Sequence, residues 1–167
     1  MVEELVDIVD DDDRVIATVT RREMRAERLL HRSVGIAVMS SDGRLLVHRR
    51  SDEKDLWPGR WDIAAGGVVM AGETYEQAAR RELAEELSIV DGELEYLGAG
   101  RYVDDDVAEI CRCYRLVHDG SFSFDDGEIT EARWVTFAEL DAMRSTHRFL
   151  PDSVALLLPL LRERFSG

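Results

Sequence analysis

The sequence GVVMAGETYEQAARRELAEELSI occupies residues 67–89 and joins a glycine-containing loop to an amphipathic helix. Ala79, Leu83 and Leu87 recur at every fourth position, which is typical of the apolar face of a helix. Thr74 and Gln77 have the spacing of a capping box, in which both side chains accept backbone N–H groups at the start of a helix. The stretch therefore predicts a loop that leads into a helix from about residue 74.

Three carboxylates gather on another face of this helix, because Glu82, Glu85 and Glu86 stand at positions i, i+3 and i+4. They repel one another, and negative charge is unfavourable near the C-terminal end of a helix dipole. The arrangement costs stability unless a cation joins it. Carboxylate oxygens suit the hard ions Mg²⁺ and Mn²⁺, so we expect one of these as a cofactor. The alternative interpretation is an ordinary surface helix with an acidic face.

The spacing of these residues resembles the Nudix box, with matches at Gly67, Glu73, Arg81-Glu82-Leu83, Glu85-Glu86 and Ile89. Ser88 stands where that family has Gly, which ends a helix with positive φ more easily than Ser does. The resemblance implies that Glu82, Glu85, Glu86 and the backbone carbonyl of Gly67 hold metal ions. It also implies that Arg81 orients a carboxylate by ion pairing, with Glu73 as its partner near the helix start.

Composition and charge narrow the classes of function. A chain of 167 residues with 45% apolar and 34% charged residues fits one domain, residues 1–167. Its net charge of -14 argues against nonspecific binding to a nucleic-acid polymer or an anionic membrane. An anionic substrate would need metal ions and arginine, and Lys54 is the one basic residue that is not Arg. Whether two copies form a homodimer stays open.

Two further features bear on the cellular compartment. The N-terminus lacks a signal pattern and no apolar run is long enough to span a bilayer, so we expect a cytoplasmic protein. Cys111 and Cys113 lie two apart in an apolar stretch, and a strand would point both to one face at a separation unsuited to a disulfide. We expect packed free thiols rather than a redox or metal-binding pair.

Apolar patterning along the rest of the chain predicts strands and helices around the central helix. Strands are expected at 3–8, 15–19, 34–39, 44–50, 94–103, 108–117 and 133–136, and helices at 20–30, 137–145 and 152–165. Pro151 suits the start of the last helix, whereas Pro159 inside it predicts a kink. Strands on both sides of a central helix favour an α/β fold with a mixed sheet between helical layers. The resemblance sharpens this to a Nudix-type α/β/α sandwich over about residues 31–165, with 1–30 as an extension made of a hairpin and a helix.

Candidate substrate-binding residues lie ahead of the Gly67 loop. Arg49 and Arg50 end a strand and would point to opposite faces, so only one of them is expected to face a given pocket. Trp57 and Trp61, with Arg60 between them, could stack on the nonphosphate part of a substrate. The alternative interpretation places both tryptophans in the core.

The segment ahead of the box also resembles type I isopentenyl-diphosphate isomerases and the bacterial Nudix hydrolases most like them. The similar residues are Leu30-His31-Arg32-Ser33, Arg49-Arg50-Ser51, Lys54, Trp57-Pro58-Gly59 and Trp61-Asp62. The isomerases carry a catalytic Cys, a Gly and a metal-binding His where this chain has Gly66-Gly67-Val68. Without the thiol and the imidazole, the groups for that proton shift are missing. The resemblance therefore favours a hydrolase.

We expect metal-dependent hydrolysis of a small-molecule diphosphate linked to another moiety, with water attacking phosphorus. A binding or regulatory module that keeps the box without turnover is the alternative from another class. Glu82 is the preferred general base. The family resemblance implies a supporting catalytic role for Glu128, because it stands six residues before Trp134 as a loop acid of the family stands before a strand Trp. Glu109 is a further candidate base. Both Glu109 and Glu128 have the alternative interpretation of solvated side chains.

Overall fold

The strand β3 (His31–Met39) is the centre of this structure, a computed structural model that describes residues 2–165. Its run of Val, Ile, Ala and Met is typical of a strand buried on both faces. β3 pairs in parallel along its whole length with β8 (Ala108–Val117). On its other edge it pairs antiparallel with β6 (Ala65–Val68). The sheet is therefore mixed, as the sequence predicts.

The other strands extend this centre on both sides. β7 (Glu95–Val103) pairs antiparallel with β8. β4 (Leu45–Arg50) follows β3 through a tight turn and pairs antiparallel with β5 (Trp61–Asp62) and β9 (Ile129–Val135). The Trp61-Asp62 segment of β5 lies beside the start of α4, because Trp61 forms a bridge with Phe149, which comes shortly before that helix.

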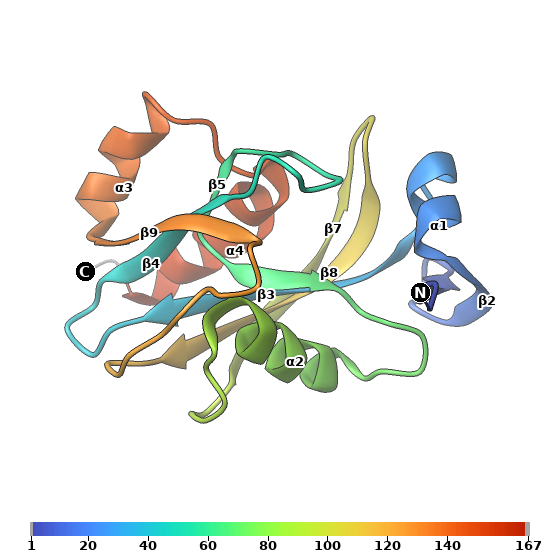
Figure 1. Ribbon diagram of the computed structural model, residues 1–167, viewed down its shortest axis with the longest axis horizontal. Helices are drawn as coiled ribbons and strands as arrows, with labels where there is room; N and C mark the ends of the chain where they lie inside the picture. The colour runs from blue at the N-terminus through green and yellow to red at the C-terminus, as the bar shows by residue number, and fades with distance from the viewer. Residues whose placement is uncertain (1, 166–167) are drawn as a thin grey trace.

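Two helices cover opposite faces of the sheet (Figure 1). α2 (Tyr75–Leu87) packs Leu83 and Leu87 against Ile36 on one face of β3. α4 (Pro151–Phe165) packs Leu157 and its neighbours against the other face, together with α3 (Phe137–Arg144). The alternation of side chains along β3 supplies both cores. The predicted α/β/α sandwich is confirmed.

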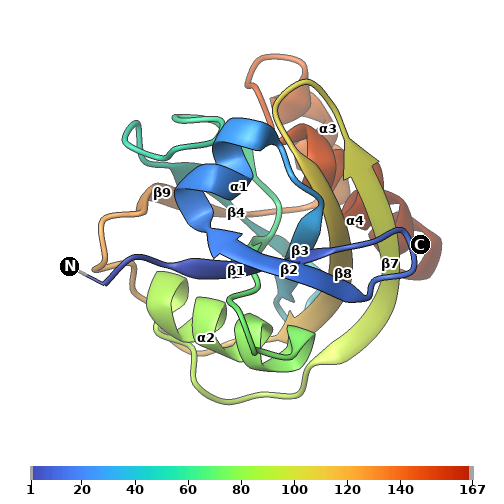
Figure 2. The ribbon, with the colours of Figure 1, turned by 90° about the vertical axis from the view of Figure 1, so that its right-hand side faces the viewer.

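The N-terminal extension lies across one end of the sheet (Figure 2). It consists of β1 (Leu5–Val9), β2 (Val15–Thr20) and α1 (Arg21–Glu27). β1 joins the main sheet where Ile8 pairs with His31. The backbone N–H of Ala71 donates to the carbonyl of Leu5, so the extension also contacts the loop ahead of α2. Both contacts fix its position relative to β3 and α2.

Some boundaries differ from the sequence prediction. The first helix was expected to continue to residue 30 but ends at Glu27, because Arg28 adopts a left-handed conformation with φ of 52°. β9 begins at Ile129 rather than at residue 133, since it pairs with β4 as far as Arg50. β5 and β6 were not predicted at all. α4 begins at Pro151, one residue before the predicted start, and continues through Pro159, where the kink stays a prediction.

The two cysteines are buried free thiols on β8, as predicted. Both belong to the core between β8 and α4. Among residues 2–165, every helix is too short or too polar to cross a membrane.

Candidate active site

Two of the three carboxylates on α2 are buried. Glu82 is 8% exposed and Glu86 is 4% exposed, whereas Glu85 faces solvent. Burial raises the pKa of the Glu82 and Glu86 carboxyls above their ordinary range, and the charge of Glu82 raises the pKa of Glu86 further. A buried pair of like charges favours a bound proton or cation.

Gly67 brings the backbone of β6 against this pair. Gly67 is held opposite Val34 in the pairing of β6 with β3. A Cβ built on Gly67 would lie 2.6 Å from Oε1 of Glu82, closer than real Cβ contacts come. Glycine is therefore required for the backbone to approach the carboxylate. The structure thus brings together two of the groups that the sequence assigned to metal binding.

Arg81 organises the acids around it. Its Nε and Nη2 donate to the two carboxylate oxygens of Glu73 at 2.8 Å each, which is the pairing that the sequence predicts. Its Nη1 donates to Glu82 at 2.7 Å and to Glu85 at 3.3 Å, while Nη2 also reaches the carbonyl of Val68 at 3.1 Å. Arg81 therefore fixes the rotamer of Glu82, and its charge opposes the effect of burial on the pKa of that carboxyl.

The chemistry of the donor set fits a hard divalent cation. Glu82 and Glu86 supply desolvated carboxylates next to the Gly67 backbone, and oxygen ligands of this kind suit Mg²⁺ or Mn²⁺. Within residues 2–165, however, no three His, Cys, Asp or Glu side chains are grouped so that they could hold a metal ion. Glu85 is paired with Arg81 and would have to leave that pair to join. Substrate and water would complete the coordination, as is common for Mg²⁺.

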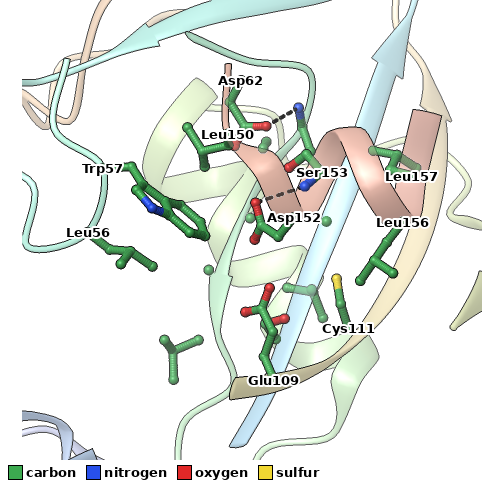
Figure 3. Close-up of a pocket in the computed structure, with 18 of the residues that line it drawn as sticks. Leu56, Trp57, Asp62, Glu109, Cys111, Leu150, Asp152, Ser153, Leu156 and Leu157 are labelled. Atoms are coloured by element: carbon green, nitrogen blue, oxygen red, sulfur yellow. Dashed lines mark hydrogen bonds between the residues drawn. The ribbon is translucent and has the colours of Figure 1, made fainter. Parts of the chain in front are cut away.

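A pocket adjoins Gly67 between β3, β6, β8 and the start of α4 (Figure 3). Three acids line it: Asp62 and Glu109, which are buried, and Asp152, which is half-buried; we call them the acidic cluster. Burial raises the pKa of Asp62 to about 7, and it also raises the pKa values of Glu109 and Asp152. Asp62 Oδ1 accepts from the N–H of Ala64 at 3.1 Å, whereas Glu109 Oε1 is buried without a hydrogen-bond partner.

Four cations, Arg21, Arg25, Arg50 and Lys54, line the same pocket, and we call them the basic cluster. Arg50 donates from Nη2 to the carbonyl of Leu56 at 2.9 Å, and its Nε is buried without a partner. The cluster collects four positive groups on a chain whose net charge is -14. The pocket is therefore suited to a ligand that carries both negative charge and hydrogen-bond donors.

Trp57 forms part of the wall of the pocket. It is 8% exposed and packs with Val107 and Leu150, and its ring meets Tyr102 edge to face at 6.3 Å. Its φ of 48° is unusual for a bulky residue and stores backbone strain. The following Pro58-Gly59 turn sets the loop in which this conformation occurs.

The structure separates the other candidate substrate-binding residues from this pocket. Arg50 lines it, whereas Arg49 points elsewhere, pairs with Asp52 at 2.9 Å and lines a second surface hollow together with Arg60. Trp61 is 4% exposed in the core, where Arg133 stacks on its ring at 4.8 Å. Trp61 is therefore a core residue, in line with the alternative interpretation of the sequence.

Glu128 lies at the edge of the basic cluster. Its Oε2 is 3.1 Å from Nζ of Lys54, and its backbone carbonyl accepts from the N–H of Ser51. Its negative charge also contributes to the raised pKa of Glu86. The loop carboxylate is thus within electrostatic reach of the acids on α2.

Sequence reasoning assigned no role to five charged residues of the pocket: Arg21, Arg25, Lys54, Asp62 and Asp152. Asp152 carries a weak signal, because an acid in the first turn of a helix is usually explained by the helix dipole alone. Arg21 and Arg25 share one face of a helix by their spacing of four, but no local pattern shows what that face contacts.

The fold and the site together define an α/β/α sandwich with a helix-borne carboxylate site beside a charged pocket. A family model described as the NUDIX domain matches residues 29–155. An uncharacterized Nudix hydrolase of Yersinia pestis is 40% identical over 158 residues, which cover 92% of this chain and 84% of that protein. The chain belongs to the Nudix family.

Solved structures share the fold of this chain. The crystal structure of DR0079 from Deinococcus radiodurans superposes with a TM-score of 0.77 at 28% identity, covering 96% of this chain and 98% of that one. The NUDIX domain of Shewanella oneidensis NrtR, solved in complex with ADP ribose, has a TM-score of 0.65 at 20% identity and covers 87% of this chain and 99% of its own. The second likeness shows the fold alone.

Proposed function

We propose that this protein is a Mg²⁺- or Mn²⁺-dependent hydrolase of a small-molecule diphosphate linked to another moiety. The observation that carries the proposal is the buried pair Glu82 and Glu86, held against the Gly67 backbone beside a pocket that contains four cations. Family membership supports hydrolysis as the reaction. Binding of ADP ribose by the NrtR domain supports a diphosphate-containing ligand.

The residues of the site would divide into metal ligands, a positioning arginine and a phosphate-binding arginine. Glu82, Glu86 and the carbonyl of Gly67 would hold the cation, with Glu85 joining if it leaves Arg81. A bound divalent cation would supply charge neutralisation of the phosphate oxygens and activation of water. Arg81 keeps Glu82 in position, and Arg50 offers its guanidinium to a substrate phosphate.

The chemical step is a displacement at phosphorus. A water oxygen forms a new bond to phosphorus while the bond to the bridging oxygen breaks, and that oxygen leaves with the electron pair. The proton of the water passes to a carboxylate, for which Glu82 is our preferred base and Glu128 has a supporting role. Glu82 is buried and accepts a hydrogen bond from Arg81, which keeps its carboxylate in one orientation for this transfer.

A proton-shifting isomerase is the less favoured enzyme class. A Cβ on Gly66 would overlap the carbonyl oxygen of Val34, so no thiol can stand at that position without moving β6 away from β3. Val68, at the position of the metal-binding imidazole in the isomerases, is buried and offers no ligand atom. Incubation with isopentenyl diphosphate and Mg²⁺ should therefore yield no dimethylallyl isomer.

Screening for turnover tests the proposed function against a binding module. Purified protein with Mg²⁺ is assayed for hydrolysis of nucleoside-diphosphate sugars, dinucleoside polyphosphates, NADH, oxidised nucleotides, coenzyme A and prenyl diphosphates. We expect metal-dependent release of phosphate-bearing products from at least one class. Tight binding without turnover across the whole panel would identify a binding module instead.

A further inference from the structure

The N-terminal extension contributes side chains to the pocket, although almost all of it lies before the region that the family model matches. The match begins at residue 29, whereas α1 spans Arg21–Glu27. Arg21 and Arg25 nevertheless line the pocket together with Arg50 and Lys54. Half of the basic cluster therefore comes from a segment that lies outside the matched region.

A cap at the start of α1 and the contacts of the preceding hairpin hold α1 in this position. Thr20 caps the helix by accepting the N–H of Glu23 at 3.1 Å. The preceding hairpin is anchored by Asp13, which accepts from Nε of Arg32 on β3 at 2.7 Å and from the hydroxyl of Tyr75 on α2 at 3.0 Å. The extension is therefore fixed to β3 and to α2, the helix that carries Glu82 and Glu86.

A single carboxylate oxygen aligns the two arginines. Oδ2 of Asp55 lies 3.4 Å from Nε of Arg21 and 3.3 Å from Nε of Arg25. Asp55 belongs to the loop that carries Trp57, so α1 and the wall of the pocket are joined at this point. Arg21 has a second carboxylate partner in Glu4 at 3.1 Å.

Arg25 is a largely buried cation that shares its ion-pair partner, Asp55, with Arg21. Its side chain is 19% exposed, and among residues 2–165 Asp55 is the one acid within ion-pair distance of it. Burial lowers the pKa of Arg25 despite the charge of Asp55, and the neighbouring charge of Arg21 lowers it further. A doubly charged phosphate group would offset this positive charge through charge-assisted hydrogen bonds.

We propose that Arg25, assisted by Arg21 and positioned by Asp55, binds an anionic phosphate group of the substrate at the side of the pocket formed by the extension. The inference rests on the proposed function only in taking a diphosphate as the ligand. Asp62, Glu109 and Asp152 also line the pocket, so the parts of the lining next to these acids are left for the rest of the substrate. The extension is thus part of the substrate site.

Calorimetric titration of the full chain with inorganic diphosphate in EDTA tests the proposal without any need for turnover. Arg25→Gln should weaken diphosphate binding about tenfold or more, because a hydrogen bond to a charged group is lost. Arg21→Gln should weaken it less, since Glu4 already satisfies part of that guanidinium. Arg22→Gln is the matched control on the same helix, because its side chain is 87% exposed.

Conservative variants keep the test independent of folding. Arg25→Lys retains the charge and the ion pair with Asp55, so it should fold with an unchanged Tm and lose only part of the affinity. If Arg25→Gln does not fold, the diphosphate affinities of Arg25→Lys and Arg21→Gln test the proposal in the same titration. Equal affinity of wild type, Arg25→Lys and Arg21→Gln, or no binding by wild type at millimolar diphosphate, would overturn the proposal.

Turnover assays separate this inference from the proposed function. Weakened diphosphate binding in Arg25→Gln, in a protein that hydrolyses no substrate of the panel, would support the phosphate site while refuting hydrolysis. Metal-dependent turnover with an unchanged KM in Arg25→Gln would support hydrolysis while refuting the role of the extension. A raised KM with a nearly unchanged kcat would support both.

Discussion

For single residues, the buried carboxylate of Glu86 gives the sharpest test of the proposed metal site. It is buried within α2, and both burial and the charge of Glu82 raise its pKa. Glu86→Gln removes one of two competing carboxylates, so the metal-free protein should become more stable at pH 8 while most of the hydrolase activity is lost. Melting curves in EDTA and rates in saturating Mg²⁺ measure the two effects.

The exposed Glu76 in the first turn of the same helix gives the matched control for Glu86. Glu76→Gln changes the charge of the protein by the same amount without touching the buried pair. Its Tm and its rate should both stay near those of wild type. Wild-type turnover by Glu86→Gln in saturating Mg²⁺ would contradict the metal assignment.

The identity of the general base is also decided by single residues. Glu82→Gln should lower kcat by about 10² to 10⁴, the usual contribution of a general base. Glu128→Gln should lower kcat by a smaller factor, because the loop carboxylate faces Lys54 and acts from a distance. Glu109→Gln tests the remaining candidate, whose Oε1 lies buried in the pocket.

Rates of these three variants are compared with Glu131→Gln, an exposed control on β9. A loss of less than about threefold in Glu128→Gln, far below the range for a base, would remove any catalytic role of the loop. A loss in Glu109→Gln that exceeds the loss in Glu82→Gln would move the base from α2 to β8.

At the scale of elements, the C-terminal end of α2 is strained. Ser88 adopts a left-handed conformation with φ of 58°, and its N–H donates to the carbonyl of Ala84 at 3.1 Å. Ser88 therefore ends the helix in the same left-handed conformation that the family's glycine favours at this position. The hydroxyl of Ser123 donates a hydrogen bond to the Ser88 hydroxyl at 2.9 Å. This contact partly offsets the cost of a Cβ in that conformation.

Ser88→Gly should raise the free energy of unfolding by up to about 1 kcal/mol, because glycine adopts positive φ without steric cost. Ser88→Ala is the companion variant, since it loses the hydroxyl contact and keeps the strain. Urea unfolding midpoints should follow the order Gly, Ser, Ala from most to least stable. A glycine variant less stable than wild type would show that the hydroxyl contact outweighs the strain.

At the scale of the whole molecule, buried titratable groups set the pH dependence of stability. The pKa of Asp62 in the folded state is about 7, above its ordinary value of 3.8, so the folded state binds more protons than the unfolded state between these limits. Stability from this group is present below about pH 4 and is lost as pH rises through 7, with a slope of at most about 1.4 kcal/mol per pH unit.

His48 acts in the opposite direction. Burial lowers its pKa from 6.5 to about 3, so its contribution is present above pH 6.5 and is lost as pH falls toward 3. Asp62→Asn removes only the first effect and can still accept from the N–H of Ala64. Urea titrations from pH 4 to 8 should show the variant gaining stability relative to wild type as pH rises. Parallel curves would show that Asp62 is ionised in the folded protein throughout this range.

Features that depend on spacing within one element can be predicted from the sequence alone. The capping box of Thr74 and Gln77 and the apolar face of α2 follow from the period of an α-helix, whereas the pairing of Glu73 with Arg81 was implied by the family resemblance. The run of apolar residues from Val34 to Met39 likewise predicts a buried strand. Local geometry fixes these relations whatever the rest of the chain does.

Tertiary structure alone decided which charged groups meet in the pocket. Arg25, Asp62, Glu109 and Asp152 come from α1, β5, β8 and α4, and no local pattern relates their positions. It also decided that Glu82 and Glu86 are desolvated while Glu85 is not, although all three lie within one turn of one helix. Burial and strand pairing are set by contacts between residues far apart in the chain, so the electrostatic environment of each carboxylate appears only once the layers have packed.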